Sequence, residues 1–478
     1  MNIVMMLALN MMSAEKTAIK VGSQKQLFVD DFFIQESEGI TLTMNPPRKD
    51  SKPCIVADQP WESHRVCGYN SVMEDEGIYK IWYDAIANDG SRWLCYATSQ
   101  NGIHWDKPKL GLVEFNGTKE NNILFPPEKR GHEPSCVFID KNPDCPPERK
   151  YKMVCSYHGL GGNGTYVFYS ADGLRWKPIS DKPSFRSSDT GNVCFWDERI
   201  GRYVAYVRIW SPMRMVGRCE FDDLSDWGKE QLVFSYDELD PPNLDFYTNA
   251  AIKYSFAENV YMIFPSAYFH YPEPPVGKYR NDGPVDIQFA TSRDGIHWTR
   301  IDRRPFVSLG IKGGWDDSAL YMTTGLIRNG AEIWMYYGGY DFTHGAYSIA
   351  EDKFKGGIGR LTLRLDGYIS ADAEYTAGNL TTVPVVFNGK QIQLNIETSV
   401  AGSVQVEILD CKSKAIPGFS LNEADVIKGN FIDKTVTWQG NADVSSLIGK
   451  PIQLHFIMRD AKLYAFQFSD AATQVTTY

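Results

Sequence analysis

The sequence predicts an all-β protein in which a five-bladed β-propeller is followed by a C-terminal β-sandwich. The first observation is a hairpin that recurs five times, at intervals of about 50 to 70 residues. The second is a turn motif, Ser-x-Asp/Asn-Gly-x-x-Trp, that follows the hairpin in several of the repeats. The third is a change of pattern near residue 371, after which short alternating strands continue without this motif. Small sheets repeated radially are typical of propellers.

Each recurring hairpin has a short apolar run, a polar turn and an aromatic-rich returning strand. Aromatic and β-branched residues on both sides of turn residues are the usual signal of a hairpin. We expect the returning strand to lie in the inner part of one blade. The returning strands are residues 79–83, 151–155, 203–207, 261–265 and 333–337.

The turn motif predicts a second hairpin in each blade. Asp or Asn and Gly tolerate the positive φ that tight hairpins need, and the Trp covers the sheet with a large apolar face. Two hairpins give a four-stranded sheet. The motif occupies residues 99–105, 170–176 and 292–298, with a degenerate version at 221–227 and a shortened one at 365–368.

The two ends of the chain lie outside the repeats. Residues 1–14 are largely apolar and end in Ser13 and Ala14, a pattern that resembles a secretory signal peptide and predicts a secreted or periplasmic protein. Residues 26–34 form one predicted strand, which we expect to complete the last blade of a propeller spanning 24–371. Residues 372–478 contain the alternating strands of a sandwich.

Composition excludes several partners. The net charge is −10, from 59 acidic and 49 basic residues, and no basic run is present, which argues against nucleic acid and anionic membranes. Beyond the N-terminus, no stretch has the 18 or more apolar residues of a membrane span. The nine cysteines lack a Cys-x-x-Cys pair, so we expect most of them to be buried thiols, with one or two disulfides left open, and we expect no metal ion and no cofactor.

Candidate functional residues stand at the strand ends that we expect to face the central funnel. Carboxylates predominate there, and glycosidic bond cleavage needs one protonated acid and one base or nucleophile. Crowded carboxylates separate the two pKa values. We assign Glu133 as the acid and Asp189 as the base or nucleophile, with Asp245 and Asp316 as stabilising or alternative groups.

The same strand ends carry candidate substrate-binding residues. The arginines suit a carboxylate, an anionic sugar or a phosphate, and Tyr247, Tyr268 and Trp210 suit sugar stacking. The predicted substrate-binding residues are Arg65, His132, Arg208, Tyr247, His270, Asp317, Asp341 and His344.

The repeated hairpins, the turn motifs and the trailing sandwich together resemble the invertase and arabinanase group of glycoside hydrolases, families 32 and 43 and their relatives. Residues 27–34 and 459–468 resemble a bacterial branch of that group, and the resemblance extends from about residue 24 to 470. The Trp-Met-Asn-Asp-Pro, Arg-Asp-Pro and Glu-Cys motifs of invertases are missing, so the resemblance supports neither a fructan substrate nor a transfer of roles by motif.

The resemblance therefore implies a glycoside hydrolase that acts on a plant, algal or host glycan. Two alternatives stay open at this point, a glycan-binding propeller without catalysis and a glycoside phosphorylase. The turn motif also resembles the Asp-box of sialidases, which have six blades and an arginine triad, whereas the sequence shows five repeats.

Overall fold

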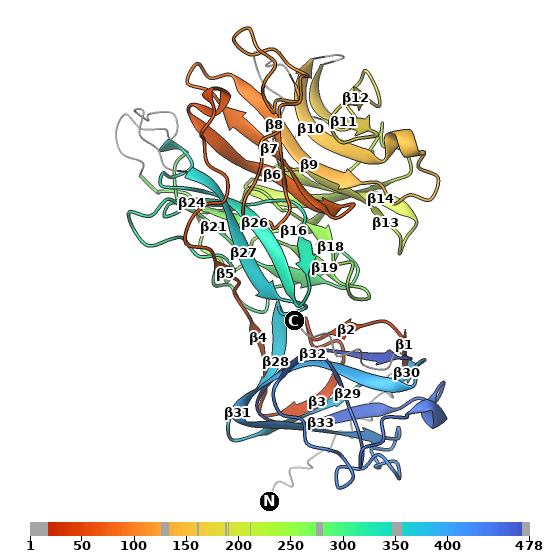
Figure 1. The fold of residues 1–478 in the computed structure, drawn as a ribbon. Coiled ribbons are helices and arrows are strands. Elements are labelled where there is room, and N and C mark those ends of the chain that lie inside the picture. The colour runs from red at the N-terminus through yellow and green to blue at the C-terminus, as the bar shows by residue number, and fades with distance from the viewer. Residues whose placement is uncertain are drawn as a thin grey trace, which may run out of the picture. The chain divides into compact units, whose positions relative to one another are not determined.

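The computed structural model describes residues 18–125, 133–159, 162–186, 189, 191–210, 212–273, 281–346 and 356–470, without the side chains of 67, 133–135 and 157–159. Its regular structure is almost entirely β-strand (Figure 1). Two compact units are present, one from Thr43 to Ile369 and one that combines Met1–Leu42 with Ser370–Tyr478. The predicted all-β architecture of a propeller and a sandwich is confirmed. The predicted signal peptide, residues 1–14, lies outside the described residues.

The first three sheets of the propeller are meanders in chain order. Each begins with the two strands of the predicted recurring hairpin, and the turn motif follows the third strand of the first two sheets. The strands are β6 (Arg65–Asp75), β7 (Ile78–Ile86) and β8 (Arg92–Ser99); β9 (Glu133–Ile139), β10 (Tyr151–Gly159), β11 (Gly162–Ser170) and β12 (Lys177–Pro178); and β13 (Val193–Asp197), β14 (Arg202–Trp210), β15 (Arg214–Phe221) and β16 (Gln231–Phe234).

The fourth and fifth repeats are joined by hydrogen bonds. Residue Val285 pairs in parallel with Ala319 and so connects strands of the fourth repeat to those of the fifth. The number of five blades therefore stays a prediction. The strands are β17 (Leu244–Phe246), β18 (Ile252–Lys253), β19 (Tyr261–Ile263), β20 (Ser266–Phe269), β21 (Val285–Ile287), β22 (Ala290–Ser292), β23 (Trp298–Thr299), β24 (Ala319–Met322), β25 (Ile327–Asn329), β26 (Glu332–Tyr340) and β27 (Gly356–Arg364).

The strand that completes the last propeller sheet is not the predicted one. Strand β5 (Arg48–Lys49) pairs with β27 at the outer edge of that sheet. The predicted closing segment, residues 26–34, lies in the sandwich, where β2 (Gln26–Leu27) pairs with β33 (Gln453–Ser469). Its apolar pattern correctly indicated burial, but a period of two does not specify which sheet covers the apolar face. The predicted start of the propeller at residue 24 was wrong for the same reason.

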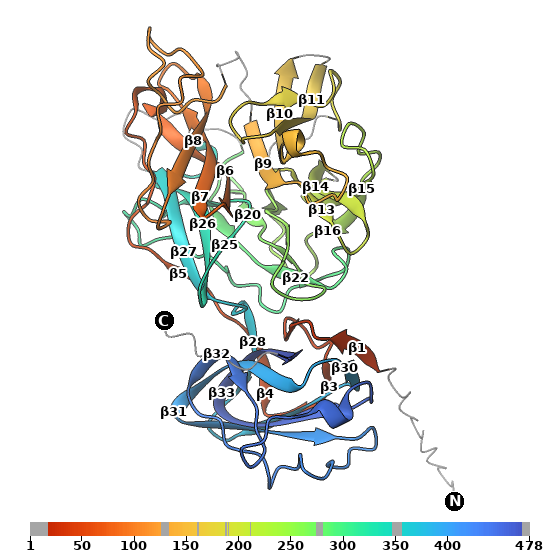
Figure 2. The same ribbon diagram turned by 45° about the vertical axis from the view of Figure 1, so that its right-hand side comes forward.

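The turn motifs connect neighbouring sheets. The carbonyl oxygen of Gly173 accepts a hydrogen bond of 2.7 Å from the indole of Trp82 in the preceding sheet. Gly173 has a φ of +75°, and a Cβ atom there would lie 2.8 Å from the Trp82 ring, so only glycine fits. The carbonyl oxygen of Gly102 likewise accepts a hydrogen bond of 2.8 Å from the Tyr336 hydroxyl, and this bond connects the first repeat to β26 of the last repeat. Figure 2 shows β6 and β7 beside β26 and β27.

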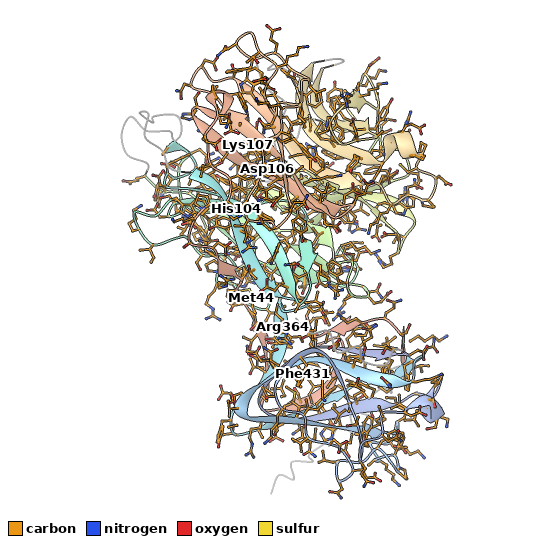
Figure 3. All side chains as sticks on the ribbon, in the orientation of Figure 1. Met44, His104, Asp106, Lys107, Arg364 and Phe431 are labelled. Atoms are coloured by element: carbon orange, nitrogen blue, oxygen red, sulfur yellow. The ribbon has the colours of Figure 1, made fainter. Side chains whose placement is uncertain are left out.

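The sandwich unit buries a separate apolar core. Phe28 lies 5.7 Å from Phe466 between ring centroids, and Phe387 stacks on Phe468 at 3.8 Å. Phe431, labelled in Figure 3, packs against this core while remaining partly exposed. The remaining strands of this unit are β1 (Ile19–Gly22), β3 (Ile34–Glu38), β4 (Ile40–Met44), β28 (Ile369–Ala373), β29 (Gly378–Thr382), β30 (Val385–Phe387), β31 (Gln391–Leu409) and β32 (Asn430–Thr435).

Two further expectations from the sequence concern the cysteine side chains and membrane-spanning segments. Cys95, Cys136, Cys155, Cys194 and Cys219 are buried free thiols and pack as small apolar residues, as expected. Across the described ranges, no helix has the length and apolar character needed to cross a membrane.

Candidate functional site

A cluster of tyrosines lies where strands from three repeats approach one another. We call Tyr69, Tyr247, Tyr268, Tyr321 and Tyr340 the tyrosine cluster. They come from the first repeat (β6), the fourth (β20 and the residue after β17) and the fifth (β24 and β26). Their rings lie about 6 Å apart: 5.7 Å for Tyr69–Tyr321, 6.0 Å for Tyr247–Tyr268 and 5.9 Å for Tyr321–Tyr340. Residues far apart in sequence therefore meet in one aromatic cluster.

His344 stands within the tyrosine cluster. Its ring centroid is 4.4 Å from that of Tyr247 and 4.7 Å from that of Tyr268, and its Nδ1 lies 2.5 Å from the Tyr321 hydroxyl. Burial lowers the pKa of His344 to about 3, and the positive charges of Arg214, Arg208 and Arg65 act in the same direction. The imidazole is therefore neutral near pH 7.

Asp245 is buried and bound by three donors. Its Oδ1 accepts from the Arg214 backbone N–H at 2.8 Å, and its Oδ2 forms an ion pair with the Arg214 guanidinium and lies 2.7 Å from His270 Nε2. Burial acts to raise the pKa of Asp245, but the hydrogen bonds from His270 and Arg214 outweigh it and hold the pKa below its usual value. Asp245 is thus a permanent carboxylate and unsuited to be the general acid.

Asp189 is a candidate carboxylate that reaches solvent. It forms an ion pair with Arg208, and its side chain is 52% exposed whereas that of Arg208 is 2% exposed. The Arg208 guanidinium stands 4.6 Å over the Tyr247 ring. Burial lowers the pKa of Arg208, and the charge of Arg214 acts in the same direction. Tyr247 opposes both effects on the pKa of Arg208.

Trp210 provides an exposed aromatic surface beside these charges. It ends β14, is 59% exposed, and has the Arg214 guanidinium 4.2 Å above its ring. Tyr247 and Tyr268, the other two residues expected to stack on sugars, are 6% and 0% exposed. Trp210 is therefore the member of the three whose ring a ligand can reach.

Asp316 and Asp317 are not brought to the tyrosine cluster. Asp316 lies 2.6 Å from Lys49 Nζ and accepts from the Tyr337 hydroxyl at 2.7 Å. Tyr337 and Tyr340 are three positions apart on β26, so their side chains point to opposite faces of the sheet. Asp316 thus sits on the face away from Tyr340, where it holds closing strand β5. Asp317 accepts from Gly313 N–H at 2.6 Å and shapes its own loop.

The remaining predicted site residues lie at the ends of strands in the first, second and fifth repeats. Arg65 begins β6, with its guanidinium 5.7 Å from the Phe342 ring and Nη1 2.8 Å from His64 Nε2. Asp341 directly follows Tyr340 at the end of β26. Glu133 begins β9 opposite Ser156, but its side chain lies outside the described residues, as does all of His132.

The sequence-based assignment omitted Arg214 and Tyr321. Arg214 begins β15 directly across from Trp210, so a hairpin with this register places the two side chains on one face. That signal was available in the sequence once the hairpin was placed. Tyr321 had no such signal, because tyrosines are common on the strands of this chain and most of them are core.

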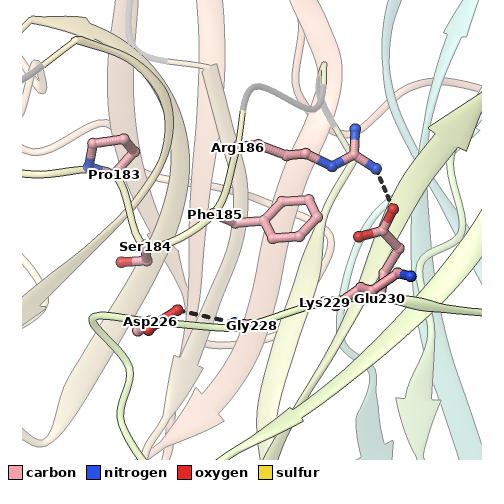
Figure 4. Close-up of a pocket in the computed structure, with 8 residues that line it drawn as sticks. All are labelled: Pro183, Ser184, Phe185, Arg186, Asp226, Gly228, Lys229 and Glu230. Atoms are coloured by element: carbon pink, nitrogen blue, oxygen red, sulfur yellow. Dashed lines mark hydrogen bonds and ion pairs between the residues drawn. The ribbon is translucent and has the colours of Figure 1, made fainter.

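An open pocket of about 480 Å³ lies elsewhere in the propeller (Figure 4). Residues 183–186, Asp226 and residues 228–230 line it, and none of them is a predicted site residue. Three of its charged groups have partners within the protein: Arg186 pairs with Glu230, and Asp226 accepts from Gly228 N–H at 3.0 Å. Over the described residues, no group of three or more His, Cys, Asp or Glu side chains is arranged to hold a metal ion.

No protein-family model matches the chain. A curated relative, the uncharacterized protein MT1551 of Mycobacterium tuberculosis (strain CDC 1551 / Oshkosh), is 23% identical over 155 residues. That match covers 29% of this chain and 45% of the relative, so the chain spans less than half of the relative's length.

Solved structures with a similar fold include three carbohydrate-related proteins. An N-acetylgalactosamine deacetylase from F. plautii in complex with blood group B trisaccharide has 16% identity and a TM-score of 0.48, covering 68% of this chain and 96% of its own. A β-1,2-mannobiose phosphorylase from Listeria innocua has 12% identity and a TM-score of 0.46, covering 67% and 97%. A thermostable family-43 glycoside hydrolase has 17% identity and a TM-score of 0.41, covering 64% and 92%. At these TM-scores the likeness carries no inference about activity.

Proposed function

We propose that the propeller hydrolyses a glycosidic bond in a plant, algal or host glycan. The observation that supports this best is a chain of contacts from a half-exposed carboxylate to an exposed aromatic ring. Asp189 pairs with Arg208, Arg208 and Arg214 stand over the same Tyr247 ring at 4.6 and 5.1 Å, and Arg214 stands over Trp210. A reactive carboxylate and a stacking surface linked by fixed cations suit a sugar ring.

We assign the role of each candidate carboxylate from its exposure, its hydrogen bonds and its position in the repeat. Asp189 acts as the base or nucleophile, because its carboxylate reaches solvent and is held in place by its ion pair with Arg208. Glu133 acts as the general acid, an assignment that rests on its equivalent position at the start of a hairpin in the neighbouring repeat. Asp245 fixes Arg214 and His270 and does not itself react, since three donors already occupy its oxygens.

The test is reducing-end release from a panel of plant, algal and host polysaccharides, in the presence and absence of phosphate. Asp189→Asn and Glu133→Gln each lower kcat by about a hundredfold or more, the lower range for a lost acid or base. Asp222→Asn is the matched control, because Asp222 is 78% exposed and pairs with Arg202 on the surface.

Two outcomes would replace this proposal with the alternatives. Tight binding of a glycan with no cleavage across the panel indicates a binding propeller. Cleavage that requires phosphate and releases a sugar phosphate indicates a phosphorylase. Unchanged kcat in both Asp189→Asn and Glu133→Gln removes the two residues from the mechanism.

A further inference from the structure

Asp282 is a buried carboxylate next to the tyrosine cluster. It follows Asn281, whose carbonyl oxygen accepts a hydrogen bond from the Tyr268 hydroxyl. Burial raises the pKa of Tyr268, and the charge of Asp282 acts in the same direction. The Asp282 carbonyl oxygen accepts from the Tyr271 N–H at 2.8 Å, which continues the pairing of β20 with β21. Asp282 therefore stands beside the candidate site, although it was not among the residues selected from the sequence.

One oxygen of Asp282 is fixed by the loop that carries His344. Oδ1 accepts from the backbone N–H groups of Gly283 and Gly345, at 2.7 and 2.8 Å. The Gly283 carbonyl oxygen in turn accepts from the His344 N–H at 3.0 Å. A Cβ atom on Gly345 would lie 2.8 Å from the Cβ of Asp282, so glycine is required for this close approach. The backbone thus holds the carboxylate in one position.

The other oxygen of Asp282 is open. Within the described part of the chain, Oδ2 accepts no hydrogen bond and no cationic side chain pairs with this carboxylate. Solvent reaches Oδ2, whereas Oδ1 of Asp286 is a sealed atom without a partner. Asp245 differs again, because three donors already occupy its oxygens. Asp282 is only 3% exposed, and leaving such a buried acceptor without a donor is unfavourable, so a ligand that supplies one gains binding energy.

We propose that Asp282 is a specificity-determining residue, which accepts hydrogen bonds from hydroxyl groups of the bound sugar. The inference rests on the proposal that the propeller binds and cleaves a glycan, and it names the groups that the site recognises. A carboxylate oxygen has more than one lone pair, so Oδ2 can accept from two neighbouring hydroxyls of a sugar ring. Hydrogen bonds to a charged acceptor are stronger than those between neutral groups, and a buried position strengthens them further. A sugar that lacks the matching hydroxyl leaves the acceptor unpaired, so the site rejects it.

The test compares a sugar with its monodeoxy analogues. Methyl glycosides of galactose, mannose, xylose and arabinose are titrated into the full chain, and binding is followed by saturation-transfer NMR, which detects weak complexes. For a sugar that binds, we expect removal of one or two particular hydroxyls to raise Kd about tenfold or more, because each loses a hydrogen bond to a charged group. Asp282→Asn removes most of this discrimination. Its amide oxygen still accepts from the two glycine N–H groups, while an NH2 group replaces Oδ2.

Two further variants separate the position of the carboxylate from its charge. Gly345→Ala keeps the charge of Asp282 but displaces the side chain, because the new Cβ atom collides with it. We expect this variant to weaken binding of the parent sugar more than binding of the deoxy analogue. Asp222→Asn is the matched control, because Asp222 is 78% exposed and pairs with Arg202 on the surface, and it leaves the discrimination unchanged.

Four results overturn the inference, and the first two need only the wild-type protein. They are the absence of binding by all four methyl glycosides, and a set of deoxy analogues in which no single change raises Kd more than about threefold. The third is an equal loss of affinity for parent and deoxy sugars in Asp282→Asn, as expected of a merely structural residue. The fourth is unchanged discrimination in that variant. If discrimination depends on Asp282 but no glycan is cleaved, the hydrolase proposal fails and the inference stands; cleavage of a glycan together with any of the four results has the opposite meaning.

Discussion

The Nε2 atom of His270 lies 2.7 Å from Oδ2 of Asp245, the same oxygen that pairs with the Arg214 guanidinium. His270 and Asp245 were both selected from the sequence as separate site residues, and in the structure a hydrogen bond joins the buried Asp245 to the partly buried His270. Asp245 and His270 thus hold the Arg214 guanidinium against one face of the exposed Trp210 ring.

The first prediction is that Asp245→Asn destabilises the fold. The substitution leaves the buried guanidinium of Arg214 without its negative partner, and breaking a buried ion pair from one side costs about 3 to 5 kcal/mol. Urea unfolding followed by circular dichroism measures the loss. Asp222→Asn, which removes a surface ion pair, changes the free energy of unfolding by about 1 kcal/mol or less. Equal stability of the two variants would contradict the structural role of Asp245.

The second prediction concerns Asp316 and the closing strand. Asp316 binds Lys49 of β5 on the face away from the tyrosine cluster. Asp316→Asn and Lys49→Met therefore lower the midpoint of thermal unfolding, while kcat of the folded protein stays within about twofold of the wild type. A large loss of kcat without loss of stability in Asp316→Asn would return this residue to the catalytic group.

The fold was largely predictable because its signals are local. Hairpins and Asp-Gly turns depend on neighbouring residues, so the repeat at 170–176 indicated a blade before any long-range contact was known. Whether residues 26–34 join the propeller or the sandwich depends on which apolar surface covers Phe28. An alternating pattern predicts a strand with one apolar face, but it does not indicate which sheet that face packs against.

The candidate site stays a prediction, and the contacts among its predicted members were only partly foreseeable from the sequence. Asp189, Arg208, Tyr247, Asp245, His270 and His344 were all chosen as strand-end residues, and the structure places them in linked contacts. Asp316 was chosen by the same rule, yet it binds the hydroxyl of Tyr337, whose side chain lies on the face of β26 opposite to that of Tyr340. Local alternation near a strand end is irregular, so the sequence did not fix the face.

The third prediction concerns Asp286, which lies at the centre of β21 opposite Ala267. Its Oδ1 is buried and has no hydrogen-bond partner among the described residues. Burial raises the pKa of Asp286 to about 7, from an ordinary value of 3.8. Because the folded protein holds this proton more tightly than the unfolded chain does, Asp286 makes stability decline as pH rises from about 4 to 7.

Asp286→Asn removes this decline, because an amide does not ionise. We expect the variant to be more stable than the wild type at pH 8, where the buried carboxylate of Asp286 is ionised, and the gain at pH 5 to be smaller by about 2 to 3 kcal/mol, since each pH unit between 5 and 7 corresponds to about 1.4 kcal/mol. Urea unfolding at the two pH values gives both differences. A gain that is equal at pH 5 and pH 8 would show that Asp286 does not titrate in this interval.

The last prediction concerns Trp210. Its ring is 59% exposed and is held from one side by Arg214 at 4.2 Å, so the ring can stack on a sugar without first being ordered. Trp210→Ala raises the Kd for the bound glycan about tenfold, which corresponds to about 1.4 kcal/mol, whereas Trp210→Phe retains most of the affinity because it keeps an aromatic face. Leu239→Ala serves as the control, because Leu239 is an apolar side chain that is 75% exposed and makes none of the contacts of Trp210 or Arg214 given above. Quenching of tryptophan fluorescence by the glycan in the wild type, and its reduction in Trp210→Phe, locates the sugar directly on this ring. Equal affinity of wild type and Trp210→Ala would mean that the glycan binds elsewhere on the propeller.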